Sequence, residues 1–127
     1  MKRILVGLML FAASSGAASA QDAASGERAF RKCSICHSVG RNAKNGVGPA
    51  LNGLDGRKSG TAEGFTYSEA NRAAAITWGE ATFKDYIQDP RARIPGTKMV
   101  FAGIKDEDEA NNLWAFLKQF GSDGEKK

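Results

Sequence analysis

Cys33-Ser34-Ile35-Cys36-His37 is the stretch from which the fold of this chain can be inferred. Two cysteines three positions apart, with a histidine directly after the second, form the C-x-x-C-H pattern typical of covalent c-type haem attachment. Each thiol would add to one vinyl group of the porphyrin, and His37 would present an imidazole nitrogen to the iron. The chain has no other cysteine and no other histidine. We therefore predict one haem c bound through Cys33 and Cys36, with His37 as an axial ligand of the iron.

Three other interpretations of this motif have less support from the sequence. A thioredoxin-like dithiol requires a βαβ setting, which the sequence does not indicate. A Cys₂His₂ zinc site needs a second histidine, which the chain lacks. A structural disulfide is geometrically feasible, but it would leave the glycine-rich stretch 39–64 without an apolar core.

The N-terminus has the three parts of a secretory signal peptide. Lys2 and Arg3 are basic, residues 4–13 are apolar, and Ala18-Ser19-Ala20 is a cleavage site. An uncleaved membrane anchor is the alternative, but it would need about 20 apolar residues. We expect cleavage after Ala20 and export to a bacterial periplasm, which leaves residues 21–127 as a single domain.

Charge excludes one class of partner. Loss of Lys2 and Arg3 with the signal peptide leaves 16 basic residues against 14 acidic ones, a net charge of +2. Neither this small excess nor any basic tract or aromatic stacking motif indicates nucleic-acid binding. Met1 and Met9 are removed in the same step, so Met99 is the only methionine of the mature chain.

Hydrophobic periodicity and capping residues predict short helices and no strands. The predicted helices cover residues 22–36, 68–75, 77–89 and 106–121. The clearest is the last, where an apolar stripe recurs at helical spacing: Ala110, Leu113, Trp114, Leu117 and Phe120. In the first helix, Gly26 indicates either a frayed turn or another helix crossing closely. Residues 39–64 should wrap around the haem as a loop, and residues 122–127 should form a flexible tail. The fold class is therefore all-α.

The sixth ligand of the iron could be a methionine, a lysine or an open position. Bis-histidine ligation is excluded within one chain because only His37 is present. Met99 follows a Pro95-Gly96 turn that could direct its thioether into a pocket. A lone methionine is usually a core residue, but here it is the remaining soft donor for the iron.

Beyond the haem motif, four further segments resemble class I c-type cytochromes, especially bacterial periplasmic cytochrome c2 and mitochondrial cytochrome c. They are Gly46-Val47-Gly48-Pro49, residues 54–60, residues 67–71 and residues 94–104. The resemblance covers residues 26–120 and implies the class I fold of short helices and long loops around one haem. It implies His37 and Met99 as axial ligands, a pairing that raises the reduction potential.

The resemblance also implies roles for polar and aromatic residues of the pocket. Pro49 would accept a hydrogen bond from His37, Phe101 would line the haem, and the methionine side would be held by Tyr86, Asn71 and Thr97. A buried propionate would be bound by Arg57, Tyr67 and Trp78. For Tyr86 and Trp78, the residues alone would favour ordinary aromatic core.

The implied function is one-electron transfer by a monomer, with only transient contact with membrane complexes. The donor would be a cytochrome bc1-type complex, and the acceptor a terminal oxidase, a reductase, a peroxidase or a photosynthetic reaction centre. Candidate docking residues are Arg31, Lys32, Lys44, Arg91, Lys98 and Lys105. The acids at positions 106–109 and Ala92 replace lysines common in mitochondrial relatives, so this basic ring is thinner. The alternative function is a haem peroxidase or gas-binding protein with a labile Met99 ligand.

Overall fold

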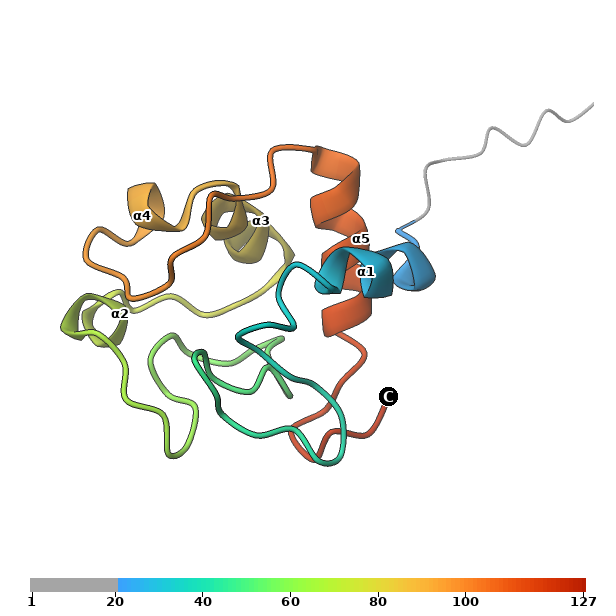
Figure 1. Ribbon diagram of the computed structural model, residues 1–127, viewed down its shortest axis with the longest axis horizontal. Helices are drawn as coiled ribbons and strands as arrows, with labels where there is room; N and C mark the ends of the chain where they lie inside the picture. Colours follow the sequence, from blue (N-terminus) through green and yellow to red (C-terminus); the bar gives the residue numbers. More distant parts are fainter. Residues whose placement is uncertain (1–20) are drawn as a thin grey trace, which may run out of the picture.

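Five helices form the regular structure of residues 21–127, the part of the chain that the computed structural model describes. In order they are α1 (Ala23–Phe30), α2 (Glu69–Ala73), α3 (Glu80–Gln88), α4 (Pro90–Arg93) and α5 (Glu107–Leu117) (Figure 1). Within this range the chain forms no strand, and extended segments meet only in two isolated bridges. The prediction of an all-α fold is confirmed. The signal peptide predicted over residues 1–20 lies outside the described residues.

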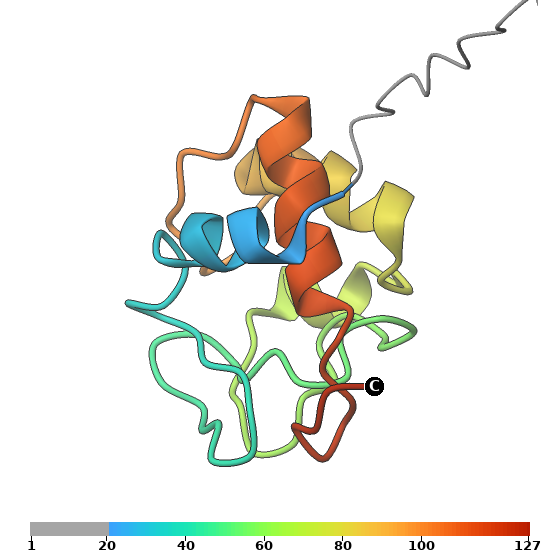
Figure 2. The ribbon, with the colours of Figure 1, turned by 90° about the vertical axis from the view of Figure 1, so that its right-hand side faces the viewer.

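The first and last helices cross (Figure 2), and Gly26 lies where they approach most closely. Helix α1 begins at Asp22, whose carboxylate accepts a hydrogen bond from Ala24 N at 2.9 Å. A Cβ atom at position 26 would overlap the carbonyl group of Asn112 and lie 2.8 Å from Cβ of Phe116. Of the two interpretations of Gly26, the close crossing is therefore the one observed.

Helix α5 carries the core. All five residues of the predicted apolar stripe are buried, and Leu113 and Leu117 are the most deeply buried. Aromatic rings connect α5 to its neighbours: Phe83 of α3 packs on Trp114 with centroids 5.2 Å apart. The predicted acidic start is also present, because the Asp106 carboxylate accepts from Glu109 N at 2.8 Å. The end differs, since the helix stops at Leu117 rather than near residue 121.

Two other helix boundaries differ from the sequence prediction. Helix α1 ends at Phe30 and not at Cys36, and residues 31–36 continue as turns. Thr77 does not open α3. Instead Gly79 caps the helix, and Thr82 Oγ1 accepts from Gly79 N at 2.9 Å.

Helix α4 was not predicted. Pro90 ends α3, but it also occupies the first turn of α4, where its missing N–H costs nothing. The Asp89 carboxylate accepts from Ala92 N at 3.2 Å and so caps this short helix. None of the helices among residues 21–127 has both the length and the apolar character needed to span a membrane.

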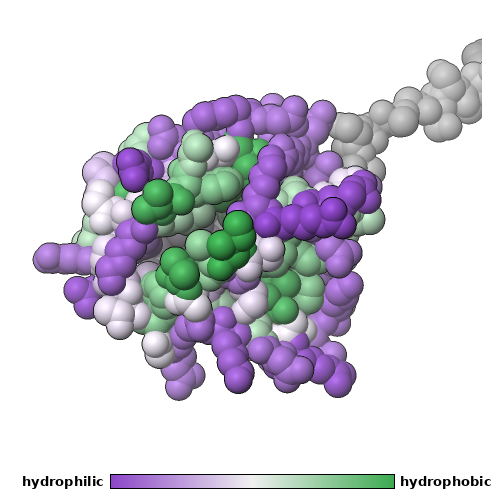
Figure 3. Space-filling view, in the orientation of Figure 1, coloured by the Kyte–Doolittle hydropathy of each residue, from purple (hydrophilic) through white to green (hydrophobic). Residues whose placement is uncertain are grey.

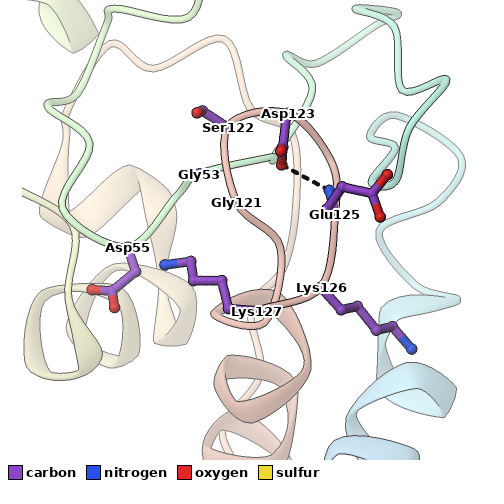
Figure 4. Close-up of a pocket in the computed structure, with 8 residues that line it drawn as sticks. All are labelled: Gly53, Asp55, Gly121, Ser122, Asp123, Glu125, Lys126 and Lys127. Carbon is purple, nitrogen blue, oxygen red and sulfur yellow. Dashed lines mark hydrogen bonds between the residues drawn. The ribbon is translucent and has the colours of Figure 1, made fainter.

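The C-terminal turn, residues 121–127, follows α5 (Figure 4). The sequence predicted a flexible tail here, whereas the described chain folds back on itself. Lys127 N donates to Gln119 O at 2.8 Å, and Gly121 N donates to the carbonyl of Glu125 at 2.9 Å. Gly124, which has a left-handed φ of +82°, allows the sharp reversal.

Candidate haem-binding site

The two cysteines and the histidine lie on the turns that follow α1. Cys36 N and His37 N both donate to Cys33 O, at 3.0 and 2.8 Å, so one tight turn fixes all three residues. Cys33 is buried, and this burial raises the pKa of its thiol to about 11, while Cys36 is half-buried. A thioether suits the position of Cys33 because it has no proton to lose and tolerates burial.

His37 is held in one orientation and one tautomer. Its Nδ1 atom lies 2.7 Å from the carbonyl oxygen of Pro49. A carbonyl can only accept, so Nδ1 carries the proton and Nε2 keeps a lone pair for a metal. Gly48 lies flat against the ring, since a Cβ there would come within 2.8 Å of Nε2. Burial is the main cause of the lowered pKa of His37, and it keeps the imidazole neutral.

Met99 is held by a polar network on the other side of the site. Tyr86 Oη donates to Met99 Sδ at 3.3 Å. Thr97 Oγ1 lies 3.3 Å from Tyr86 Oη and accepts from Asn71 Nδ2 at 3.1 Å. Burial raises the pKa of Tyr86, so its hydroxyl remains a donor. The structure thus brings together the residues expected on the methionine side.

Arg57 has a buried nitrogen without a partner in the described protein. Its Nη1 donates to the carbonyls of Ala50 and Asn52 at 2.9 and 3.2 Å, whereas Nε is buried and makes no hydrogen bond. Burial also lowers the pKa of this guanidinium. An anionic group such as a haem propionate would satisfy Nε and offset the desolvation of the charge.

The other two residues expected at the propionate differ in their surroundings. Trp78 is buried, with its ring centroid 5.1 Å from that of Tyr86. Tyr67 is half-buried, and its hydroxyl accepts from Ala62 N at 2.9 Å, which leaves its own proton available to a propionate. Neither contacts Arg57 by a hydrogen bond within residues 21–127.

Apolar side chains surround a hollow on the face seen in Figure 3. Three large apolar residues are exposed in the protein alone: Ile35 (84%), Val47 (78%) and Val100 (80%). They come from the three segments that carry Cys36, Pro49 and Met99. Phe101 is half-buried and packs against the core. An apolar rim of this kind, with a neutral imidazole, a thioether and an unpaired guanidinium N–H, fits haem c.

No competing metal centre is formed within residues 21–127. No group of three or more His, Cys, Asp and Glu side chains is arranged there to hold an ion. His37 and Met99 remain the predicted donors to an iron.

The six predicted docking residues are all exposed, but they divide into two groups. Three are tied to the protein: Lys32 pairs with Glu109 at 2.5 Å, Lys98 Nζ donates to Thr66 O at 3.0 Å, and Lys105 Nζ donates to Gln88 O. The side chains of Arg31, Lys44 and Arg91 form no ion pair or hydrogen bond with the rest of residues 21–127.

The sequence interpretation missed two asparagines that shape the loop. Asn45 Oδ1 accepts from Ala50 N at 2.9 Å, and its Nδ2 donates to Glu63 O at 2.8 Å. Asn52 Oδ1 accepts from Gly40 N at 2.9 Å, and its Nδ2 donates to Gly40 O at 2.7 Å. Both precede a glycine, and Asn-Gly is a turn signal that could have drawn attention to them.

Comparisons with known proteins identify the family of the chain. Residues 23–121 match the model of the cytochrome c family. Cytochrome c2 of Blastochloris viridis is 58% identical over 127 residues, 100% of both chains. Cytochrome c2 of Rhodoplanes tepidamans is 64% identical over 107 residues, which are 84% of this chain and 100% of that protein. The solved structure of cytochrome c2 from Rhodospirillum centenum has a TM-score of 0.75 at 42% identity, covering 79% of this chain and 98% of its own.

Proposed function

The chain belongs to the cytochrome c family, and we propose that His37 and Met99 are the axial ligands through which it works as an electron carrier. Its function is one-electron transfer rather than catalysis, with one covalently attached haem c as the cofactor. That group supplies an iron whose oxidation state changes by one electron. The residues of the chain attach it, orient the two ligands and exclude water.

The observation that carries the ligand assignment is the pair of hydrogen bonds that fix the two donor atoms. Pro49 O fixes the tautomer of His37, so that Nε2 is the free donor. Tyr86 Oη fixes the thioether of Met99 from the other side. Ligands held before and after electron transfer need little rearrangement, which favours fast transfer. A hydrogen bond to the sulfur also withdraws electron density, which favours the reduced state.

The test of this assignment is Met99→Ala, with Val100→Ala as a matched control. Val100 is the exposed neighbour of Met99, so its truncation removes similar apolar bulk without removing sulfur. We expect Met99→Ala to keep its haem, lose the red charge-transfer band of a Met–Fe bond in the oxidised protein, and show a lower potential. An unchanged potential and spectrum would remove Met99 from the ligand role.

The peroxidase or gas-binding alternative needs an open or labile sixth position. No observation favours it, since the thioether of Met99 is held by Tyr86. A high-spin spectrum of the oxidised wild-type protein would nevertheless reverse this preference.

We further propose that the mature protein is residues 21–127, a single domain in the periplasm. Removal of residues 1–20 would leave 107 residues, the length over which the Rhodoplanes tepidamans protein matches in full. The mass of the exported protein tests this, because cleavage after Ala20 and one added haem fix a single value. A heavier chain would show that the segment is retained.

We propose that a cytochrome bc1-type complex reduces this carrier and that an oxidase, a reductase, a peroxidase or a photosynthetic reaction centre oxidises it. The exposed apolar rim of Ile35, Val47 and Val100 would form the centre of a small, transient contact. Unpaired cations, such as Lys44 and Arg91, would steer an acidic partner over a Debye length.

Ionic strength tests this docking proposal. Lys44→Ala should slow association at low salt and flatten its salt dependence, whereas the double variant Lys32→Ala/Glu109→Ala should have less effect because it removes a pair with no net charge. Equal effects of the single and the double variant would contradict the proposed distinction between free and paired cations.

A further inference from the structure

The C-terminal turn lies against the loop that reaches His37, here called the proximal loop (residues 40–53). Figure 4 shows the turn folding back beside Gly53 and Asp55. Its backbone is closed by hydrogen bonds, among them that from Lys127 N to Gln119 O at 2.8 Å. It is therefore a defined element that can support what it touches.

The first contact is made at the start of the proximal loop. Gly124 lies against the backbone of Gly40 and Arg41 so closely that a Cβ at position 124 would be 2.7 Å from Arg41 N and would overlap the Gly40 carbonyl. Gly124 also has a left-handed φ of +82°. Beside it, the Arg41 guanidinium pairs with the Glu125 carboxylate. Only glycine fits at position 124 on both grounds.

The second contact is made at the end of the proximal loop. Gly53 N donates to Phe120 O at 3.0 Å, just before the turn begins. The two ends of the loop are also joined to each other, because the Asn52 amide both accepts from and donates to the backbone of Gly40. The loop is thus closed at its base and seated on the C-terminal turn.

The tip of the same loop holds His37. Gly48 packs on the imidazole ring, and Pro49 O accepts the hydrogen bond from Nδ1. Gly48 N also donates to Cys36 O at 2.8 Å. Movement of the loop base would therefore change the distance between the Pro49 carbonyl and the imidazole.

We propose that the C-terminal turn braces the proximal loop and thereby positions His37. The inference rests on the proposed role of His37 as an iron ligand. A hydrogen bond to the outer nitrogen makes an imidazole a more basic ligand. A more basic ligand favours the oxidised iron, so loosening the brace should raise the potential.

The test compares Gly124→Ala with Gly56→Ala in the haem-bearing protein. Gly56 has nearly the same φ, +86°, but no atom outside its own chain neighbours would lie within 4 Å of an added Cβ. Both variants therefore carry the same backbone strain, and only Gly124→Ala forces the turn away from Gly40. A chain that ends at Ser122 serves as a second variant, which removes the turn without strain.

We expect Gly124→Ala and the shortened chain to accelerate amide exchange at Gly48 and Leu51 by at least about tenfold relative to Gly56→Ala. In the reduced protein, the Nδ1–H signal of His37 should shift and exchange faster, and the potential should move upward. If the exchange rates, the His37 signal and the potential match those of Gly56→Ala, the brace is refuted.

The outcome separates this inference from the ligand assignment on which it rests. The brace fails alone if His37 still shows the NMR signature of an iron ligand while the turn variants leave it unchanged. The ligand assignment fails first if the wild-type protein itself lacks that signature. Loss of global stability without a change at His37 would likewise count against a positioning role.

Discussion

Gly26→Ala is predicted to destabilise the protein, against the intrinsic preference of helices. In an exposed helix interior, alanine is better than glycine by about 1 kcal/mol. Here the added Cβ would overlap the Asn112 carbonyl and lie 2.8 Å from Phe116 Cβ. Overpacking costs about 1–3 kcal/mol, and the upper end applies because a backbone carbonyl inside α5 cannot rotate away. The net loss should be about 2 kcal/mol once the propensity gain is subtracted.

The structure also indicates which contacts would be lost. Asp22 N donates to Asn112 Oδ1 at 2.9 Å, and the rings of Phe30 and Phe116 lie 5.4 Å apart. Both depend on the separation of α1 and α5 at Gly26. If the helices move apart to admit a methyl group, these contacts weaken together.

Denaturant unfolding of the haem-bearing protein measures the effect, provided that the slope with denaturant is unchanged. Glu27→Ala and Glu27→Gly provide the control, because Glu27 is exposed in the same helix and their difference reports helix propensity alone. We expect the alanine variant to be the more stable of that pair. A Gly26→Ala protein at least as stable as the wild type would refute the close-crossing argument.

Three further predictions follow from hydrogen bonds and charges at the site. Tyr86→Phe removes the donor to Met99 Sδ and should lower the reduction potential, as measured by redox titration, while the Met–Fe band remains. Arg57→Gln removes a half-buried cation from the proposed propionate site. It should also lower the reduction potential, because a nearby positive charge stabilises the reduced state of the iron. Asp22→Ala should reduce stability at neutral pH. The Ser25 hydroxyl and the Ala24 N–H lower the pKa of Asp22, so its contribution is present above the ordinary aspartate pKa and is lost as the pH falls through the lowered value. Unfolding curves of the wild type and the Asp22→Ala variant should therefore converge in strong acid.

The sequence was sufficient for the parts of the fold and site that depend on local pattern. The C-x-x-C-H motif places two thiols and an imidazole on one turn whatever surrounds it. The stripe of α5 is apolar at helical spacing, and its burial follows from that spacing alone. Met99 was predicted as the second ligand by counting, since a chain cleaved after Ala20 would offer no other thioether. For Gly26, the sequence showed an anomaly and the crossing helix explained it.

What the sequence could not supply are contacts between backbone groups distant along the chain. The close approach of Gly124 to the backbone of Gly40 leaves no pattern of side chains in the sequence. The polar C-terminus was therefore interpreted as flexible. The same limit applies to Lys32, which as an exposed lysine near the haem motif was a natural docking candidate. Only the position of α5 beside α1 shows that Glu109 neutralises it. The local error at Thr77 has a different cause, since the helix begins after Gly79, whose N–H donates to Thr82 Oγ1 rather than to a Thr77 cap.

The loops between α1 and α2 show how the fold and the function depend on each other. Residues 38–68 contain no helix, so their backbone groups lack the regular partners that secondary structure provides. Asparagine side chains provide these missing hydrogen-bond partners. Asn45 and Asn52 together make four hydrogen bonds to backbone atoms of these loops. Such bonds fix the path of a chain but bury little apolar surface, which must come from elsewhere. The haem that His37 would bind is the apolar group available to them, and the Pro49 carbonyl that orients His37 lies in the same loops. A loop that is fixed by its own polar groups and completed by the cofactor would hold the proposed ligand His37 in the same place in both redox states. That constancy is what an electron carrier requires.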